Sequence, residues 1–170
     1  MEAKRIDDEV KNDVVKTYYD NGELKSRANY KNGELDGQYE IWYSNGQLWT
    51  RANYKDGERN GLRETWYPTG QQLSRANYKD GERNGLCEDW HSNGQLKSRT
   101  NYKDDKLDGL RETWDENGQQ WSRANYENGK LDGLREEWYE NGKPWERSTC
   151  TEPPMFYEPL LTVCSLLLMI

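Results

Sequence analysis

Aromatic, charged and glycine positions recur along this chain with a period of 24 residues. Tryptophans occupy one position of the period, arginines a second and tyrosines a third, and all 15 glycines fall into three further positional classes. A fixed period of this length is typical of repeat proteins, in which each unit is one small supersecondary motif. The three side-chain classes are Tyr18, Trp42, Trp66, Trp90, Trp114 and Trp138; Arg27, Arg51, Arg75, Arg99, Arg123 and Arg147; and Tyr30, Tyr54, Tyr78, Tyr102 and Tyr126.

Each unit is predicted to form a β-hairpin. In the fourth unit, short runs at 85–91 and 96–102 flank an Asn-Gly pair. This pair favours a two-residue type I′ turn, because that turn needs a positive φ at both central residues. Thr69 replaces asparagine before Gly70, so that turn is expected to be the least ideal. The second connection, as at 55–61, is longer, and the sequence leaves its register open.

A two-residue loop fixes the cross-strand partners, because their residue numbers then add to a constant within each unit. The predicted charged pairs are Glu40 with Arg51, Glu64 with Arg75, Glu88 with Arg99, Glu112 with Arg123, and Glu136 with Arg147. The predicted partners of the tryptophans are Trp42 with Trp49, Trp90 with Lys97, Trp114 with Trp121, and Trp138 with Trp145. Alternation along a strand puts both sets on one face. The other face is expected to carry pairs such as Tyr78 opposite Gly61.

The predicted fold is all-β, an elongated single-layer antiparallel β-meander of tandem hairpins. A helical interpretation fails, because glycine recurs at intervals of 4 to 15 residues and no apolar stripe of helical period persists. The repeat array is expected to cover 18–150 with roughly 11 to 12 strands, after an N-terminal cap at 1–17. Residues 151–170 form an apolar, proline-containing C-terminal tail. This tail is expected to fold over the last hairpin, to lack structure, to contact a membrane, or to be an altered continuation of the chain.

The composition indicates a thin but ordered protein. Hydrophobic residues make up 32% of the chain, charged residues another 32%, and the formal net charge is −7. Disordered chains share this polarity but are poor in aromatic residues, whereas 12% of this chain is aromatic. The acidic balance argues against general binding to nucleic acids or anionic membranes, which needs a cationic surface. Residues 1–13 contain no apolar stretch of the kind found in a secretory signal.

The titratable residues give no catalytic or metal-binding motif. Cys87, Cys150 and Cys164 are odd in number and lack framework spacing, which favours free thiols in a reducing compartment and a cytoplasmic location. His91 is the single histidine, so no zinc or other metal and no cofactor is predicted. His91 and Cys87 are interpreted as exposed substitutions at repeat positions rather than as a catalytic base and a nucleophile. The chain is therefore predicted not to be an enzyme.

The repeat unit resembles the MORN-repeat variant that occurs in tandem in many bacterial proteins. The resemblance rests on W-Y-x-N-G-Q-L followed by A-N-Y-K-D/N-G-x-x-x-G, as in 42–61, and it covers residues 14–150. It implies a β-meander that serves elsewhere as a protein scaffold and sometimes contacts membrane lipids. Some bacterial proteins of this type are classed as antitoxin-like partners of a toxin. MORN arrays also occur fused to phosphoinositide kinases, but this chain has no kinase segment, so the resemblance brings no catalytic residue.

The recurring tryptophans give the main hypothesis about function. Aromatic residues dominate the binding energy of many interfaces, so this row is predicted to bind another protein or a second copy of the chain. The competing interpretation is that the rings pack within their own sheet and replace a core. A peripheral membrane or lipid-associated tethering module, acting through 155–170, is the alternative function. The predicted partner-binding row, hereafter the Trp row, consists of Trp42, Trp66, Trp90, Trp114 and Trp138.

Overall fold

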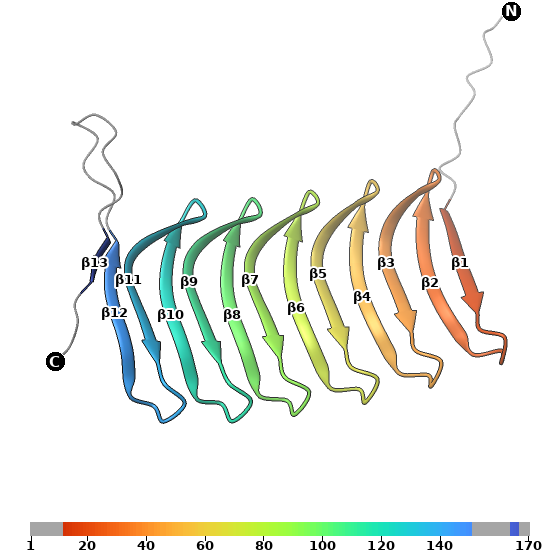
Figure 1. The fold of residues 1–170 in the computed structure, drawn as a ribbon. Helices are drawn as coiled ribbons and strands as arrows, with labels where there is room; N and C mark the ends of the chain where they lie inside the picture. Colours follow the sequence, from red (N-terminus) through yellow and green to blue (C-terminus); the bar gives the residue numbers. More distant parts are fainter. Residues whose placement is uncertain (1–11, 151–163, 167–170) are drawn as a thin grey trace, which may run out of the picture.

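The computed structural model describes residues 12–150 and 164–166. They form one antiparallel sheet of 13 strands, arranged side by side in chain order (Figure 1). The prediction of an all-β meander of tandem hairpins is confirmed. The described residues contain no helix that is long and apolar enough to cross a membrane. The strands are β1 (Asn12–Tyr18), β2 (Leu24–Lys31), β3 (Glu34–Trp42), β4 (Leu48–Lys55), β5 (Glu58–Trp66), β6 (Gln72–Lys79), β7 (Glu82–Trp90), β8 (Leu96–Lys103), β9 (Lys106–Trp114), β10 (Gln120–Glu127), β11 (Lys130–Trp138), β12 (Pro144–Cys150) and β13 (Cys164–Leu166).

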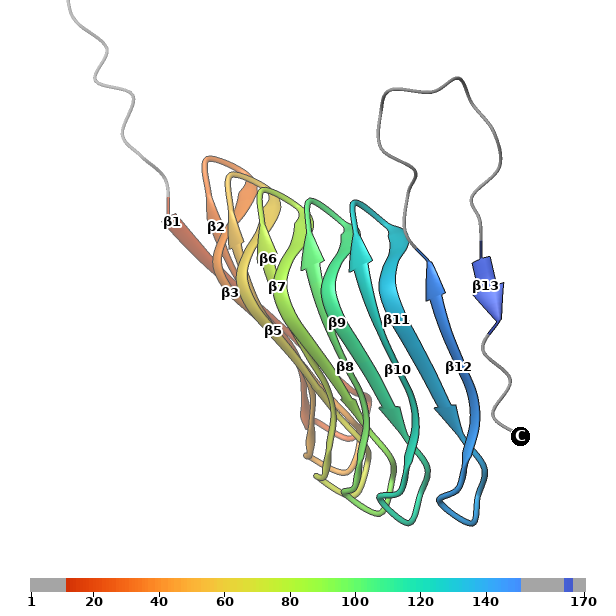
Figure 2. The same cartoon turned by 90° about the vertical axis from the view of Figure 1, so that its left-hand side faces the viewer.

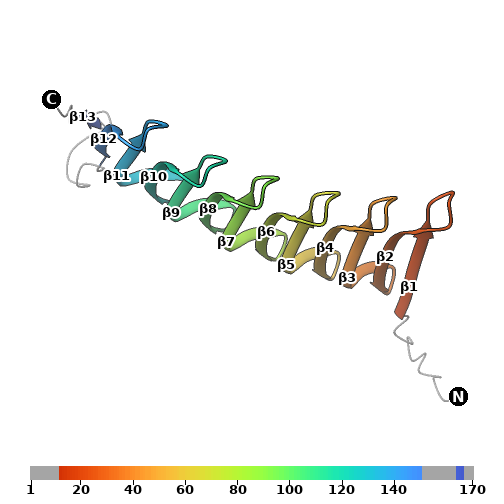
Figure 3. The same cartoon turned by 90° about the horizontal axis from the view of Figure 1, so that it is seen from below.

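The sheet is a long single layer. Figures 2 and 3 show the hairpins following one another in steps, with no second layer of described residues against either face. Strand β1 begins at Asn12, so the sheet includes residues 12–17, which the sequence assigned to a cap. At the far end, β13 pairs antiparallel with β12. The remaining parts of the predicted cap and tail lie outside the described residues.

Two-residue turns join the even-numbered strands from β2 to β10 to the strands that follow them, along one edge of the sheet. Lys31 stands opposite Glu34, which leaves Asn32 and Gly33 as the turn. Both turn residues have a positive φ, of 52° and 86°, as a type I′ turn requires. The sequence placed its type I′ turns at the other connection, so that prediction was wrong. We call this edge the turn edge, formed by residues 32–33, 56–57, 80–81, 104–105 and 128–129.

The Asn-Gly pairs lie in longer loops at the opposite edge. The Gly46 amide donates to the Tyr43 carbonyl at 3.0 Å, and the Tyr43 amide donates to the Gln47 carbonyl at 2.8 Å. Gly46 has a φ of +81°, whereas the preceding Asn45 is not left-handed. These features define a three-residue hairpin loop in which glycine follows a type I turn. We call this edge the loop edge, formed by residues 19–23, 43–47, 67–71, 91–95, 115–119 and 139–143.

The asparagine of the loop is used for its side chain rather than for its backbone freedom. Asn45 Oδ1 accepts the Gln47 amide at 3.1 Å, and its Nδ2 donates to the Pro68 carbonyl of the next loop at 2.9 Å. Because only the glycine needs a left-handed φ, Thr69 fits its loop and Gly70 keeps a φ of +87°. The expectation that the Thr69-Gly70 turn is the least ideal was wrong.

The longer loop changes the pairing of the tryptophans but not that of the charges. Beyond the Glu40–Arg51 pair the register shifts by one residue, so Trp42 stands opposite Leu48 instead of Trp49. The same shift precedes every member of the Trp row, and the predicted tryptophan pairs are wrong for this reason. Directly opposed charged residues are Glu40 and Arg51, Glu64 and Arg75, Glu88 and Arg99, Glu112 and Arg123, and Glu136 and Arg147. The residues opposite the Trp row are Leu48, Gln72, Leu96, Gln120 and Pro144.

Glycines within the odd-numbered strands allow a neighbouring asparagine to approach closely. Gly61 has a φ of +104°, and a side chain there would meet Asn53 Cβ at 3.5 Å. The Asn53 side chain donates to the Leu62 carbonyl at 3.3 Å. Tyr78 stands opposite Gly61, as the sequence predicts. The glycine class that includes Gly61 therefore serves a bulge rather than a turn.

The most buried side chains are small or charged. Among the described residues, the buried hydrophobic side chains are all alanines, namely Ala28, Ala52, Ala76 and Ala124. Glu40 is 2% exposed and Glu88 is 5% exposed, although both are charged residues. A single layer cannot build a thick apolar centre, so the deepest positions are filled by carboxylates that have partners.

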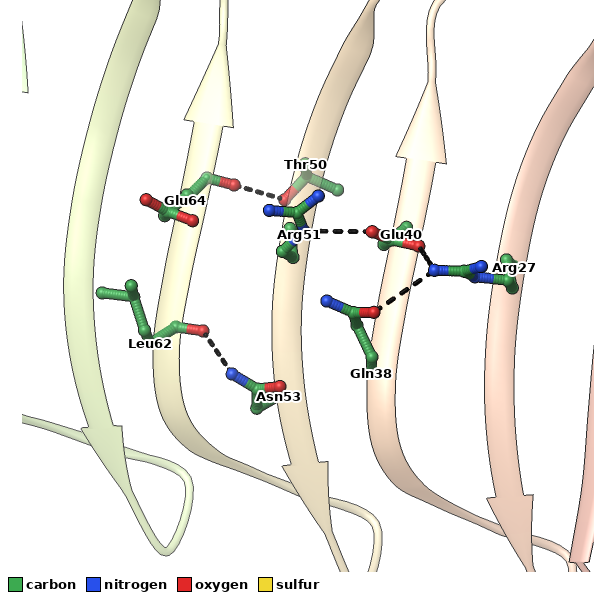
Figure 4. Close-up of polar contacts among 8 residues, drawn as sticks. All are labelled: Arg27, Gln38, Glu40, Thr50, Arg51, Asn53, Leu62 and Glu64. Carbon is green, nitrogen blue, oxygen red and sulfur yellow. Dashed lines mark hydrogen bonds and ion pairs between the residues drawn. The ribbon is translucent and has the colours of Figure 1, made fainter.

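Glu40 is held between two arginines on neighbouring strands. Figure 4 shows its carboxylate between Arg27 and Arg51, at 2.5 Å and 3.0 Å. Arg27 also donates to Gln38 at 3.3 Å. In contrast, the half-buried Glu64 carboxylate has no hydrogen bond or ion pair within the described residues, and only its backbone carbonyl accepts a bond from Thr50.

We predict that Glu40→Gln lowers the free energy of unfolding by about 1.5–3 kcal/mol, the range for hydrogen bonds to charged groups. Replacement leaves two partly buried guanidinium groups without their carboxylate. The matched variant Glu64→Gln is expected to change it by less than about 0.5 kcal/mol, because no such pair is lost. Urea unfolding followed by tryptophan fluorescence measures both. Equal losses in the two variants would contradict the importance of the Glu40 pairs.

A second prediction concerns Asp105, which has a φ of +60° where other repeats have glycine. Arg83 Nε donates to its carboxylate at 2.6 Å. Asp105→Ala loses this pair and keeps the strained backbone, so a loss of about 0.5–1 kcal/mol in unfolding free energy is expected. Asp105→Gly relieves the strain and is expected to stay close to the parent protein.

The same Asp105 pair has a defined pH dependence. The hydrogen bonds from Arg83 lower the pKa of the Asp105 carboxyl below its ordinary value of 3.8. Its stabilisation is therefore present above the ordinary pKa and is lost as the pH falls through the lowered one. Urea unfolding at pH 7 and at pH 3 should show the gap between Asp105→Ala and the parent narrowing in acid. If the difference in unfolding free energy between the parent and Asp105→Ala instead increases in acid, the ion pair with Arg83 is not its cause.

Candidate functional site

The Trp row lies at the loop edge, where each of its members is the last residue of an odd-numbered strand. The fold brings all five rings to equivalent positions in successive repeats, as the period predicts. All five are half-buried rather than exposed. The row is therefore partly used for packing within the sheet.

Tyrosines link the first three loops to the Trp row in the next repeat. The hydroxyls of Tyr19, Tyr43 and Tyr67 donate to the carbonyls of Trp42, Trp66 and Trp90, at 2.6, 2.9 and 3.0 Å. Each bond joins residues 23 positions apart, so it links one repeat to the next. Burial raises the pKa of the Tyr43 hydroxyl, which keeps it protonated as a donor. Sequence reasoning did not identify this bond.

His91 takes the position of these tyrosines in the fourth repeat. Its Nε2 lies 3.0 Å from the Trp114 carbonyl, and because a carbonyl only accepts, Nε2 carries the proton. The residue lies in a loop as predicted, but it is half-buried and not exposed. The sequence did not predict this partial burial, because the His91 side chain turns from its loop toward the next repeat. This hydrogen bond gives His91 a structural role equivalent to that of Tyr67.

One arginine of the Glu–Arg pairs lies over a ring of the Trp row. The Arg51 guanidinium lies 5.9 Å from the centre of the Trp66 ring, within the range of a cation–π contact. This contact is the kind expected if the rings pack within their own sheet.

The more exposed tryptophans occupy a different position of the repeat. Trp49, Trp121 and Trp145 are 44%, 48% and 57% exposed, although the predicted pairing placed them against the Trp row. The sequence carries a signal that identifies this position as exposed, because Lys25 and Lys97 occupy it in other repeats. Lysine is almost never fully buried without a partner.

Each of two exposed tryptophans stacks on an aromatic residue of its own loop. The Tyr43 and Trp49 rings are 5.8 Å apart and tilted by 34°, and the Tyr139 and Trp145 rings are 6.1 Å apart and tilted by 45°. These separations are typical of aromatic pairs. The loop edge therefore presents ring faces in fixed orientations.

A surface hollow of about 570 Å³ lies near the C-terminal end of the loop edge. Aromatic rings from two adjacent repeats share its lining, which also includes polar groups of the last loop. The lining residues are Trp121, Trp138, Tyr139, Glu140, Asn141 and Trp145. Four of its six lining residues are aromatic.

Two further titratable side chains, those of Arg83 and Cys87, lie against neighbouring strands. Arg83 lies 4.0 Å from the centre of the Tyr102 ring. Cys87 is half-buried, although it was predicted to be exposed, because it lies in the middle of β7 between Ala76 of β6 and Thr100 of β8. Burial raises the pKa of its thiol, against a smaller opposite effect of Arg83. No group of three or more His, Cys, Asp or Glu that could hold a metal ion occurs in the part of the chain that the structure describes.

Comparison with known proteins agrees with this architecture. The family model described as "MORN repeat variant" matches six successive segments, at 14–32, 35–56, 59–80, 83–104, 107–128 and 131–149. No curated protein matches the chain significantly. The matched segments cover most of the described sheet, one hairpin-sized unit after another. The chain therefore belongs to the MORN-repeat variant family.

Proposed function

We propose that this protein is a non-catalytic scaffold that binds another protein, or a second copy of itself, along the loop edge. MORN repeats are consistent with a repeat protein that mediates interactions. The observation that carries the proposal is the set of exposed tryptophans, Trp49, Trp121 and Trp145, beside the half-buried Trp row. Tryptophan is enriched among the residues that dominate interface energies.

The shape of the sheet also favours binding to an extended partner. Two strands make one repeat, so equivalent side chains recur about every 9–10 Å along the edge. Because the described sheet is a single layer, a partner can approach either face without displacing another layer. An antitoxin-like role, in which the partner is a toxin, is one form of this scaffold. A membrane-tethering role would depend on residues 155–170, and these lie almost entirely outside the described residues.

The proposal of a non-catalytic protein is supported by the state of its candidate nucleophile. The Cys87 thiol has a raised pKa, whereas a reactive cysteine needs a lowered one. The His91 ring is bonded to the Trp114 carbonyl in the next repeat. Neither residue has the arrangement of an activated nucleophile and its base.

We predict that Cys87 reacts slowly while the protein is folded. In a Cys150→Ser, Cys164→Ser background, alkylation by iodoacetamide at pH 8 is expected to be roughly tenfold slower than in urea, because burial disfavours the thiolate. Mass spectrometry gives both rates. A folded-state rate above that of a free thiol would indicate an activated cysteine and would count against the non-catalytic proposal.

We also predict that partner binding depends on the exposed tryptophans. Replacing Trp49, Trp121 and Trp145 together with leucine should reduce partner capture or self-association by at least about tenfold, as expected for residues at the centre of an interface. The thermal midpoint should fall only modestly, because leucine retains part of the apolar contact and already occupies this repeat position as Leu73. Cross-linking with the full chain as bait, together with sedimentation of the purified protein, measures both forms of association.

A matched control replaces Val14 and Val15, which are also exposed but lie on β1 away from the loop edge. This control should retain association. Unchanged association in the tryptophan variant would reject the loop edge as the binding surface. A collapse of its thermal midpoint would instead show that these rings only stabilise the sheet.

A further inference from the structure

The aromatic hollow depends on two exposed tryptophans that stand one repeat apart. Trp121 and Trp145 are separated by 24 residues and line the same hollow. Trp49 occupies the same repeat position and is similarly exposed, but its counterparts in the adjacent repeats are Lys25 and Leu73. Among the described residues, the hollow formed by paired tryptophans is thus confined to the last two loops. We call Trp121, Trp138, Tyr139 and Trp145 the aromatic cluster.

The rings of the aromatic cluster are both accessible and oriented. Trp121 and Trp145 are about half exposed, and Tyr139 is 53% exposed. The tilted contact between Tyr139 and Trp145 holds one wall in place, while the half-buried Trp138 contributes to the same lining. Ring faces that are fixed before binding lose little conformational entropy on contact with a ligand.

Exposed carboxylates lie in both loops beside the cluster. Glu116 and Glu140 occupy a loop position that holds Asp20 in the first loop and Ser44, Pro68 and Ser92 in the next three. Both glutamates are exposed, and their carboxylates have no hydrogen bond or ion pair within the described residues. Asp115 adds a third carboxylate, but it accepts two backbone amides of its own loop. Lys143 is the single cation of these two loops.

Aromatic faces beside unpaired carboxylates favour one class of ligand. The negative face of a tryptophan ring attracts cations, and a carboxylate at the rim can pair with the same charge. A guanidinium group is planar, stacks on rings and is weakly hydrated, whereas the lysine ammonium group is compact and strongly hydrated. The chain's net charge of −7 also attracts a basic partner.

We propose that the aromatic cluster binds arginine side chains of an extended basic segment in a partner protein. One guanidinium stacks on Trp121 and a second on Trp145, with Glu116 and Glu140 pairing at the rim. Two strands separate the tryptophans, which corresponds to about 10 Å. Arginines three residues apart in an extended segment of polyproline II type lie on one side of that segment and span about 9 Å. This inference rests on the proposed scaffold function and specifies the chemistry of its partner.

The test uses the full chain and an acetylated, amidated peptide, Gly-Arg-Gly-Gly-Arg-Gly. Tryptophan fluorescence and calorimetry measure its dissociation constant. Two further peptides replace both arginines with citrulline, which keeps the shape and removes the charge, or with lysine, which keeps the charge and removes the plane. We expect binding to weaken by at least about tenfold for citrulline and by about threefold or more for lysine.

The protein variants separate the cluster from the rest of the loop edge. Trp121→Leu and Trp145→Leu should each weaken binding by about tenfold, and leucine is tolerated at this position because Leu73 already occupies it. The matched control Trp49→Leu should leave the dissociation constant unchanged. Glu140→Gln should weaken binding about twofold to threefold and should reduce its dependence on salt.

Three results would overturn the proposal: no binding of the arginine peptide at millimolar concentration, equal binding of the citrulline peptide, or an equal loss in Trp49→Leu. Far-ultraviolet circular dichroism of each variant verifies that the sheet is intact. Failure here is distinguishable from failure of the scaffold function. If partner capture depends on the exposed tryptophans while the arginine peptide does not bind, the scaffold function holds and the ligand class is wrong.

Discussion

A single layer of strands has to be stabilised by its own neighbouring strands, because no second layer of described residues covers either face. Polar pairs therefore take positions that a larger domain fills with apolar side chains. The Glu40 carboxylate, buried between Arg27 and Arg51, joins three strands from two successive hairpins. At the turn edge, the Gly57 amide donates to the Leu35 carbonyl of the preceding hairpin at 2.9 Å. Interactions of this kind between neighbours are the basis of additive stability in repeat proteins.

The fold was predictable because several features of one unit depend on the same period. Glycine, tryptophan and arginine positions together exclude a helix and predict a meander, and opposite charges such as Glu64 and Arg75 indicate the strand pairing. The turn types were not predictable from the dipeptides alone. Asn-Gly occurs in both connections, at 32–33 as a two-residue turn and at 45–46 within a three-residue loop. At 32–33 both residues have a positive φ, whereas at 45–46 only Gly46 does, and the 67–71 loop has the same form with Thr69 in place of asparagine.

The candidate site was predictable in its location but not in its exposed residues. The period places Trp42 and its equivalents in a row. However, each loop of the loop edge contains one residue more than predicted, so Trp49 does not stand opposite Trp42. That single shift decides which tryptophans pack and which face solvent. The role of His91 was hidden for a related reason, since its hydrogen-bond partner is a backbone carbonyl, Trp114, in the following repeat. Sequence patterns identify side-chain types and do not identify such carbonyl partners.

The repeat therefore contains two kinds of positions with different physical roles. Residues such as Glu40, which pairs with Arg27 and Arg51, contact both neighbouring strands, so a change there disturbs the array. Positions such as those of Trp121 and Glu140 contact few other groups and differ in chemistry between repeats. A binding site can be assembled in adjacent repeats by substitutions at these variable positions without altering the sheet. The adjacent Trp121 and Trp145 are such a combination, since the same position holds lysine or leucine elsewhere in an equally regular fold.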